Sequence, residues 1–304
     1  MKNSFKKSIL LPFMSLLIVG GLSSCNFIIT TGGGNSVDDY GISTKLSGPK
    51  LINELHAKMM RDHRTYVRYA QYSNYTKAST SPRSIDQSAT DSDKNVMFYS
   101  GKLVSKSTSY TREHVWACAN SNGLYTHNSA DGDHYVDSGA YYGAGSDLYS
   151  IRPCEYNVNE KRGNGKFYEF RDDETKYAIY ENSTALAFYS DREEDFGQKI
   201  EPTDQFKGDI VRILYYTYIH YSSIGDNSGY AEASRILGRL DLGDVFNGTY
   251  TKTEIYRLML KWNELDPVDD TERLRNDTIE QIQGNRNPFV DHPEYMARCF
   301  DLDE

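Results

Sequence analysis

The stretch Thr111-Arg112-Glu113-His114-Val115-Trp116 is the part of the sequence that says most about the fold. In an extended segment, neighbouring glutamate and histidine side chains point to opposite faces, so they cannot share one metal ion from an ideal strand. At a strand end or a β-bulge the two can converge on one site. Taken alone, the dipeptide is far more typical of an exposed glutamate beside a half-buried histidine than of a metal or catalytic site. Its meaning therefore depends on the motifs around it.

Segment 119–146 is rich in Gly, Tyr and Asp, and we expect it to be a long irregular loop. A second group of candidate functional residues follows it. Residues 147–153 (Asp-Leu-Tyr-Ser-Ile-Arg-Pro) predict a strand that leaves the core at its proline. Beyond them, Asn157 or Asn159 is either a helix cap or a neutral oxygen ligand that Mg²⁺ accepts beside a carboxylate. The nearby positive charge fits a phosphate-binding cleft or a solvated surface, and it comes from Arg152, Lys161, Arg162 and Lys166.

Hydrophobic periodicity predicts helices elsewhere in the chain. The segments concerned are one from about residue 49 through Met59, Asp209–Ser222, Thr253–Leu265 with Thr251 or Thr253 as its cap, and one from Thr271 to near Gly284. A strand is expected at Asn95–Ser100. No repeat or linker divides this region, so we predict one α+β domain at residues 49–304.

The first 24 residues are typical of an export signal, with lysines followed by an apolar run from Ile9 to Val19 and then small residues. The sequence Leu22-Ser23-Ser24-Cys25 resembles a lipobox, which predicts lipidation at Cys25; ordinary cleavage is the alternative. Residues 25–48 would then be a flexible tether. Removing residues 1–24 takes away three lysines and no acid, so the net charge changes from −9 to −12. We expect an exported, acidic protein at the cell surface or in the periplasm.

The C-terminal stretch 283–295 is dense in Asn, Arg, Pro and His. Asp291 and His292 could be metal ligands by type. We favour a role in fixing a tight loop against the core, because nothing else ligand-like lies beside them in the sequence.

These motifs together resemble the endonuclease I family of secreted or periplasmic bacterial nucleases, and the resemblance covers roughly residues 50–300. The motifs occur in family order: Arg-Glu-His-Val-Trp at 112–116, Asp-Leu-x-x-Ile-Arg-Pro at 147–153, Val-Asn-x-x-Arg-Gly-Asn at 158–164, Lys-Gly-Asp-Ile-Val-Arg at 207–212, Lys-Trp-x-x-x-Asp-Pro-Val at 261–268, and Gln-Gly-Asn-Arg-Asn-Pro-Phe-Val-Asp-His-Pro-Glu-Tyr at 283–295.

The resemblance implies a His-Me finger (ββα-metal) core surrounded by helices. It implies His114 as the general base, and Glu113 and Asn159 as ligands of one divalent cation, normally Mg²⁺, with Mn²⁺ or Ca²⁺ as alternatives. The family's transition-state arginine has no counterpart in segment 119–146, which lacks Arg and Lys. Arg152 and Arg162 are the expected substitutes.

The leading hypothesis is a lipid-anchored, monomeric, metal-dependent endonuclease that cuts DNA, with RNA as a further substrate to be tested. Cutting without sequence preference fits recognition through phosphates. The alternative is a surface-binding lipoprotein on a catalytically degenerate form of the same fold. Intact Glu113, His114 and Asn159 favour the enzyme. Because Cys118 and Cys154 flank the candidate site, we expect them to be the disulfide pair if one forms.

Overall fold

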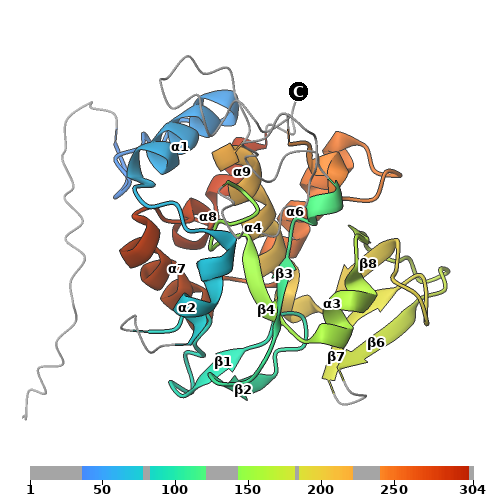
Figure 1. The fold of residues 1–304 in the computed structure, drawn as a ribbon. Helices are drawn as coiled ribbons and strands as arrows, with labels where there is room; N and C mark the ends of the chain where they lie inside the picture. Colours follow the sequence, from blue (N-terminus) through green and yellow to red (C-terminus); the bar gives the residue numbers. More distant parts are fainter. Residues whose placement is uncertain (1–35, 78–82, 121–142, 182–184, 222–239, 301–304) are drawn as a thin grey trace, which may run out of the picture.

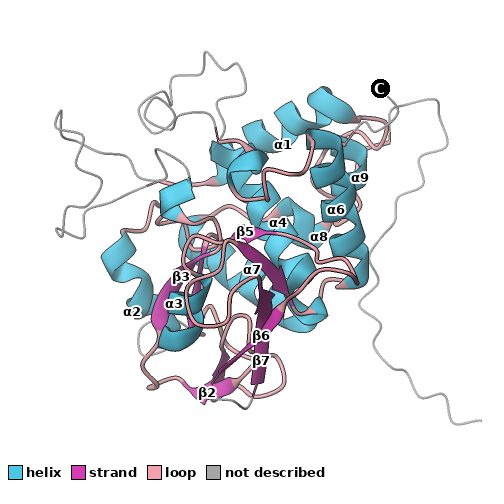
Figure 2. Cartoon of the chain, turned by 90° about the vertical axis from the view of Figure 1, so that its right-hand side faces the viewer, coloured by secondary structure: helices cyan, strands magenta, loops and turns pink. Residues whose placement is uncertain are grey.

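The computed structural model describes residues 36–77, 83–120, 143–181, 185–221 and 240–300. The chain is α+β, with its strands gathered at the end of the molecule away from α1 and α9 (Figures 1 and 2). No helix in these ranges is long and apolar enough to cross a bilayer. The expected signal segment, Cys25 and most of the loop predicted at 119–146 lie outside the described residues.

The longest helices agree with the predicted ones in position: α1 (Gly48–Asp62), α4 (Asp204–Tyr221), α6 (Lys252–Leu265) and α7 (Asp270–Gln283). The short helical segments are η1 (Tyr69–Gln71), α2 (Tyr72–Thr76), η2 (Cys118–Asn120), α3 (Tyr156–Arg162), η3 (Leu242–Asp244), α8 (Pro288–Asp291) and α9 (Tyr295–Cys299). The sequence placed the start of α4 several residues too late, because its first turn is polar and carries Asp204, which suits a helix N-terminus.

Helix α4 is the centre of the helical body and packs against α1, α6 and α8. It is buried along most of its length, and its charged residues are therefore ion-paired. Arg212 is fully buried and makes a two-pronged contact with Glu272 of α7. Gly208 lets α4 approach the end of α6, because a Cβ at this position would lie 2.0 Å from the Asp266 carbonyl oxygen.

The described strands form three small sheets. Their members are β1 (Lys94–Val96) with β2 (Leu103–Ser105), β3 (Thr111–His114) with β4 (Ile151–Cys154), and the order β5 (Lys166–Phe167), β8 (Lys199–Pro202), β7 (Ala185–Ser190), β6 (Tyr177–Glu181). Of the strand pairs within the described residues, β5–β8 is parallel and the others are antiparallel. The strand expected at Asn95–Ser100 is wrong beyond Val96, because residues 97–101 turn into the β1–β2 hairpin.

The last part of the segment expected to be a tether, residues 36–47, has contacts with the folded chain. Residues 36–47 fold against the C-terminal segment, where Ile42 is buried and Arg298 donates hydrogen bonds to the carbonyl oxygens of Ser43 and Leu46. These contacts join residues far apart in the chain, so local composition did not reveal them.

Candidate functional site

Strands β3 and β4 and helix α3 bring the sequence-predicted residues together. The strands are antiparallel, with Glu113 opposite Arg152 and His114 opposite Ile151. Helix α3 follows β4 after Glu155 and packs against β3. The neighbouring Asn157 and Asn159 are both inside the helix, so neither is its cap.

The two faces of β3 carry different groups, as the alternation of an extended segment predicts. Arg112 and His114 contact Tyr69 of η1, whereas Glu113 contacts Tyr99 and Arg162. His114 is the last residue of β3. The histidine therefore lies at a strand end, which is where the sequence analysis allowed the two side chains to serve one site.

The His114 ring is held on two sides. Its Nε2 lies 2.8 Å from the carbonyl oxygen of Gly145, and its plane stacks on Tyr69 with ring centroids 5.2 Å apart. Because a carbonyl only accepts, Nε2 carries the proton in the neutral ring and Nδ1 carries the lone pair. Burial lowers the pKa of His114 to about 4, against the opposing effect of the hydrogen bond to Gly145. The imidazole is therefore neutral near pH 7.

Tyr69 is a site residue that the sequence analysis missed. The Arg112 guanidinium carbon lies 3.8 Å from the Tyr69 ring centroid, and Arg112 donates a 2.8 Å hydrogen bond to the Tyr69 carbonyl oxygen. One tyrosine thus supports both the cation and the imidazole on this face. Tyr69 lies far upstream of the motif, so no local signal marked it.

Glu113 is a buried carboxylate with defined partners. It is 2% exposed, accepts a 2.8 Å hydrogen bond from the Tyr99 hydroxyl and lies 3.2 Å from Arg162 Nε. Burial raises the pKa of Glu113, and the charge of Arg162 opposes that shift. Among the described residues, Tyr99 is the non-glycine residue with positive φ, at 68°. This conformation is costly and places the hydroxyl on the carboxylate.

Asn159 shares a helical face with Arg162. Residues three apart on a helix are neighbours, and Arg162 contacts Glu113, so Asn159 faces the same side of β3. Asn159 is half-buried, and no hydrogen bond of its side-chain amide to another described residue is present. A carboxylate oxygen and an amide oxygen are the hard donors that Mg²⁺ prefers. The donor set therefore fits a divalent cation.

The two arginines expected at the transition state are both buried and ion-paired. Arg162 is 1% exposed and donates to the carbonyl oxygens of Val115 and Gly163. Arg152 is 3% exposed, with ion pairs of 3.5 Å to Asp86 and 3.3 Å to Asp209. Removing one partner of such a buried pair leaves an uncompensated charge, so the present contacts of both arginines favour a role inside the protein.

The structure also answers the question that the sequence left open for the cysteines. Among the described cysteines, Cys118, Cys154 and Cys299, no disulfide forms, so the pair Cys118–Cys154 is absent. Cys154 is fully buried in β4, and burial raises its thiol pKa well above the usual range. At the C-terminus, the tight-loop role of Asp291 and His292 is supported, because Asp291 accepts from Arg286 and Tyr40, and His292 contacts Asp39 and Glu294.

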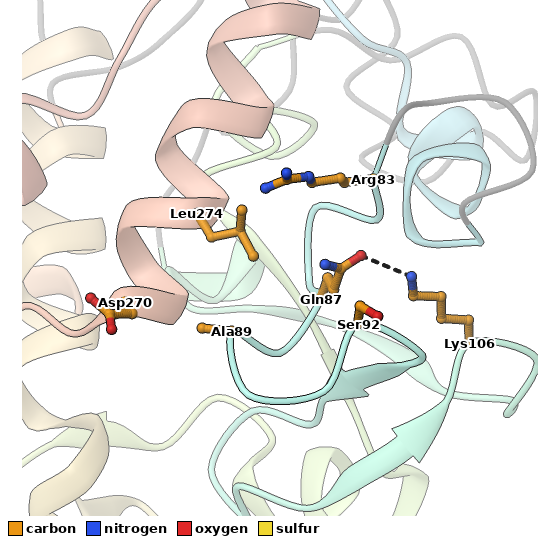
Figure 3. Close-up of a pocket in the computed structure, with 7 residues that line it drawn as sticks. All are labelled: Arg83, Gln87, Ala89, Ser92, Lys106, Asp270 and Leu274. Carbon is orange, nitrogen blue, oxygen red and sulfur yellow. Dashed lines mark hydrogen bonds between the residues drawn. The ribbon is translucent and has the colours of Figure 1, made fainter. Parts of the chain in front are cut away.

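An open surface cavity of about 570 Å³ lies elsewhere, beside α7 and the segment before β1 (Figure 3). Lys106 donates a 2.9 Å hydrogen bond to Gln87 across one side of it. Its lining residues are Arg83, Gln87, Ala89, Ser92, Lys106, Asp270 and Leu274. None of the predicted site residues lines it, so this cavity is not the candidate active site.

Comparison with known proteins defines the class. The chain is 33% identical over 257 residues to an extracellular ribonuclease of Bacillus subtilis (strain 168), covering 82% of this chain and 73% of that protein. It is 31% identical over 264 residues to an extracellular ribonuclease of Bacillus amyloliquefaciens, covering 84% of this chain and 75% of that protein. A third relative is Endonuclease-1 of Buchnera aphidicola subsp. Baizongia pistaciae (strain Bp). It is 25% identical over 146 residues, which cover 48% of this chain and 46% of that protein.

The molecule is thus a nuclease, a phosphodiester hydrolase acting on nucleic acid. The Endonuclease I family matches residues 47–294, which include every site residue described above. The chain belongs to the Endonuclease I family.

Proposed function

We propose that this chain is a metal-dependent endonuclease that hydrolyses phosphodiester bonds in both DNA and RNA without sequence preference. The observation that carries the proposal is the placement of the His114 ring, which is fixed by Gly145 and Tyr69 at the end of the strand that also carries the buried Glu113. With its proton on Nε2, the ring takes a proton from an attacking water through Nδ1. The Bacillus relatives named extracellular ribonucleases support RNA as a substrate.

The attacking group in this proposal is water, so the 2′-hydroxyl of RNA has no chemical role. A base that activates water serves ribose and deoxyribose backbones alike. Recognition then goes through phosphates, which are the same at every base. The proposal therefore includes both substrates in one site.

Glu113 and Asn159 would hold the divalent cation of the proposed ββα-metal site, with Mg²⁺ as the first candidate and Mn²⁺ or Ca²⁺ as alternatives. When bound, the cation supplies Lewis-acid stabilisation of charge at the phosphate. Tyr99 and Arg162 fix the Glu113 carboxylate from the protein side. These two residues position the ligand and do not contact substrate.

Arg112 replaces Arg152 and Arg162 as the proposed cation at the phosphate. It is half-buried, lies on the His114 face of β3 and is stacked on Tyr69. A guanidinium held in this way makes charge-assisted hydrogen bonds to phosphate oxygens.

We further propose that the protein is exported as a monomer and anchored through lipid at Cys25. The lipobox-like sequence and the word extracellular in the names of the Bacillus relatives support this. Mass spectrometry of the N-terminal peptide is the test: an unmodified peptide from the membrane fraction would contradict the anchor.

The nuclease proposal is tested on supercoiled plasmid and on an RNA oligonucleotide, with Mg²⁺ or with EDTA. We expect cleavage of both only with Mg²⁺, and RNA products without a 2′,3′-cyclic phosphate. His114→Ala should reduce the rate at least about 10²-fold, as expected for loss of a general base. His56→Gln is the control, because that ring binds the Ile219 carbonyl and is not part of the site.

Cleavage that survives His114→Ala would rule out this base. Cyclic phosphate on the RNA products would rule out water as the attacking group. A folded protein that cuts neither substrate with Mg²⁺, Mn²⁺ or Ca²⁺ would favour the binding-lipoprotein alternative.

A further inference from the structure

A cluster of His63, Asp147 and His220 lies outside β3, β4 and α3. His63 follows α1, His220 is in the last turn of α4, and Asp147 precedes β4. All three are buried, with exposures of 6%, 3% and 1% for His63, Asp147 and His220. One potential ligand atom from each lies within 4.8 Å of the others.

Asp147 is a buried carboxylate whose partners among the described residues are hydrogen-bond donors without a charge. Its Oδ2 accepts hydrogen bonds from the Tyr216 and Tyr221 hydroxyls at 2.8 and 2.7 Å, and its Oδ1 accepts from the Tyr149 amide and from Gln283. No lysine or arginine of the described chain forms an ion pair with it. Buried charges in proteins are paired with an opposite charge or coordinate a metal. The position beside the carboxylate therefore suits a cation.

The two histidines present nitrogens at that position. His63 Nε2 faces the Thr65 carbonyl oxygen at 3.2 Å and so carries a proton, which leaves the lone pair on His63 Nδ1. His220 Nε2 lies 2.8 Å from that Nδ1 and donates to it. The Nδ1 atom of His220 is buried and has no hydrogen-bond partner. With this tautomer assignment, the His220 Nε2 proton lies between two imidazole nitrogens, and a carboxylate oxygen of Asp147 lies within 4.8 Å of a ring nitrogen of each histidine.

We propose that His63, Asp147 and His220 form a structural site for a divalent transition-metal ion of the zinc type. Binding moves the proton of His220 from Nε2 to the unpartnered Nδ1 of the same ring, so both facing nitrogens present lone pairs and no net proton is lost. The nitrogens separate from 2.8 Å to about 3.4 Å, as Zn–N bonds of about 2.0–2.1 Å in tetrahedral geometry require.

The surroundings of the cluster match those of metal sites. The outer nitrogen of a ligating histidine commonly donates to a carbonyl, as His63 does to Thr65, and ligating carboxylates are commonly held by further hydrogen bonds, as Tyr216 and Tyr221 hold Asp147. Two imidazoles and one carboxylate select zinc-like ions over Mg²⁺ and Ca²⁺. The ion ties the ends of α1 and α4 to the segment that carries Gly145, the hydrogen-bond partner of His114.

The test uses the full chain, stripped with a chelator and titrated with Zn²⁺ alone, with bound metal measured by mass spectrometry after dialysis. We expect one tightly bound Zn²⁺ that raises the melting temperature. His63→Gln and His220→Gln should each weaken binding about 100-fold or more. His56→Gln, which removes a histidine ring next to α4 but no ligand, should bind normally. Glu113→Gln, at the proposed catalytic site, should also bind normally.

Three results would overturn the proposal. They are a folded wild-type chain without tight Zn²⁺ binding, binding that survives both His63→Gln and His220→Gln, and binding lost only in Glu113→Gln. If the histidine variants do not fold, X-ray absorption of the Zn²⁺-loaded wild type decides. Two imidazole ligands support the site, and an all-oxygen or thiolate shell rejects it. Because none of these readouts is nuclease activity, failure of the nuclease proposal is distinguished from failure of this one.

Discussion

At the scale of single residues, the candidate site contains a buried ion pair and a tyrosine whose backbone φ is positive. Arg162 neutralises Glu113, and Tyr99 at φ 68° donates to the same carboxylate. Both charged groups are almost completely buried. A buried pair of this kind adds little net stability, but removing one partner leaves an uncompensated charge in the core.

We therefore expect Arg162→Met to lower the free energy of unfolding by about 3–5 kcal/mol. The double variant Glu113→Gln with Arg162→Met should recover part of that loss, because no charge is then left unpaired. Arg61→Met is the control: Arg61 is 67% exposed on α1, so its loss should change stability by no more than about 0.5 kcal/mol. Urea unfolding measures all three, and an Arg162→Met loss no larger than the control would contradict the role of the pair.

At the scale of elements, helix α6 shows how an N-cap residue fixes the residue at which a helix begins. Thr251 Oγ1 accepts from the Glu254 amide at 3.3 Å, and Glu254 Oε2 accepts from the Thr251 amide at 2.7 Å. This reciprocal pair is a capping box. Thr253 was the other candidate cap from the sequence, and it lies within the first turn of the helix.

We expect Thr251→Ala to destabilise the protein by about 1 kcal/mol, because it leaves an amide at the helix start unsatisfied. Thr253→Ala is the matched control and should be neutral within a few tenths of a kcal/mol or slightly stabilising, since alanine is the better helix former. Thermal unfolding of the two variants compares them directly. Equal losses would mean that the capping box does not stabilise α6.

At the scale of the whole molecule, the two ends of the described chain pack against each other. Residues 36–47 pack on the C-terminal segment, where Tyr295 donates to Asp38 and His292 Nε2 lies 2.6 Å from an Asp39 oxygen. Partial burial lowers the pKa of His292, but hydrogen bonds to Glu294 and Asp39 outweigh it, and the net pKa is raised. The stability that this junction contributes should therefore depend on pH.

A group whose pKa is raised on folding stabilises the protein fully below its unfolded pKa, about 6.5 for histidine, and this contribution is lost as pH rises through the folded value. We expect the stability difference between wild type and His292→Gln to be largest near about pH 5.5 and to shrink above the folded pKa. Urea midpoints across that range give the difference. A difference that grows with pH would show that the neutral ring is the stabilising form.

Sequence patterns were sufficient for the parts governed by local rules. The α1, α6 and α7 helices follow from apolar spacing and terminal signals, and residues 112–116 and 158–164 marked the strand and helix that carry Glu113, His114 and Asn159. Side-chain alternation also gave the opposite faces of Glu113 and His114. These features depend on backbone periodicity, which is encoded within a few residues.

Only the tertiary structure decided which charged groups are buried and which ion-pair partner each has. Arg152 and Arg162 were plausible phosphate ligands by type, yet both are ion-paired in the interior. Tyr69, Tyr99 and the Gly145 carbonyl orient the site from segments distant in sequence or outside its motifs. The family and the motif of the candidate site were thus determined by the sequence, whereas desolvation and long-range pairing, which set the environment of each charge, exist only once the chain is folded.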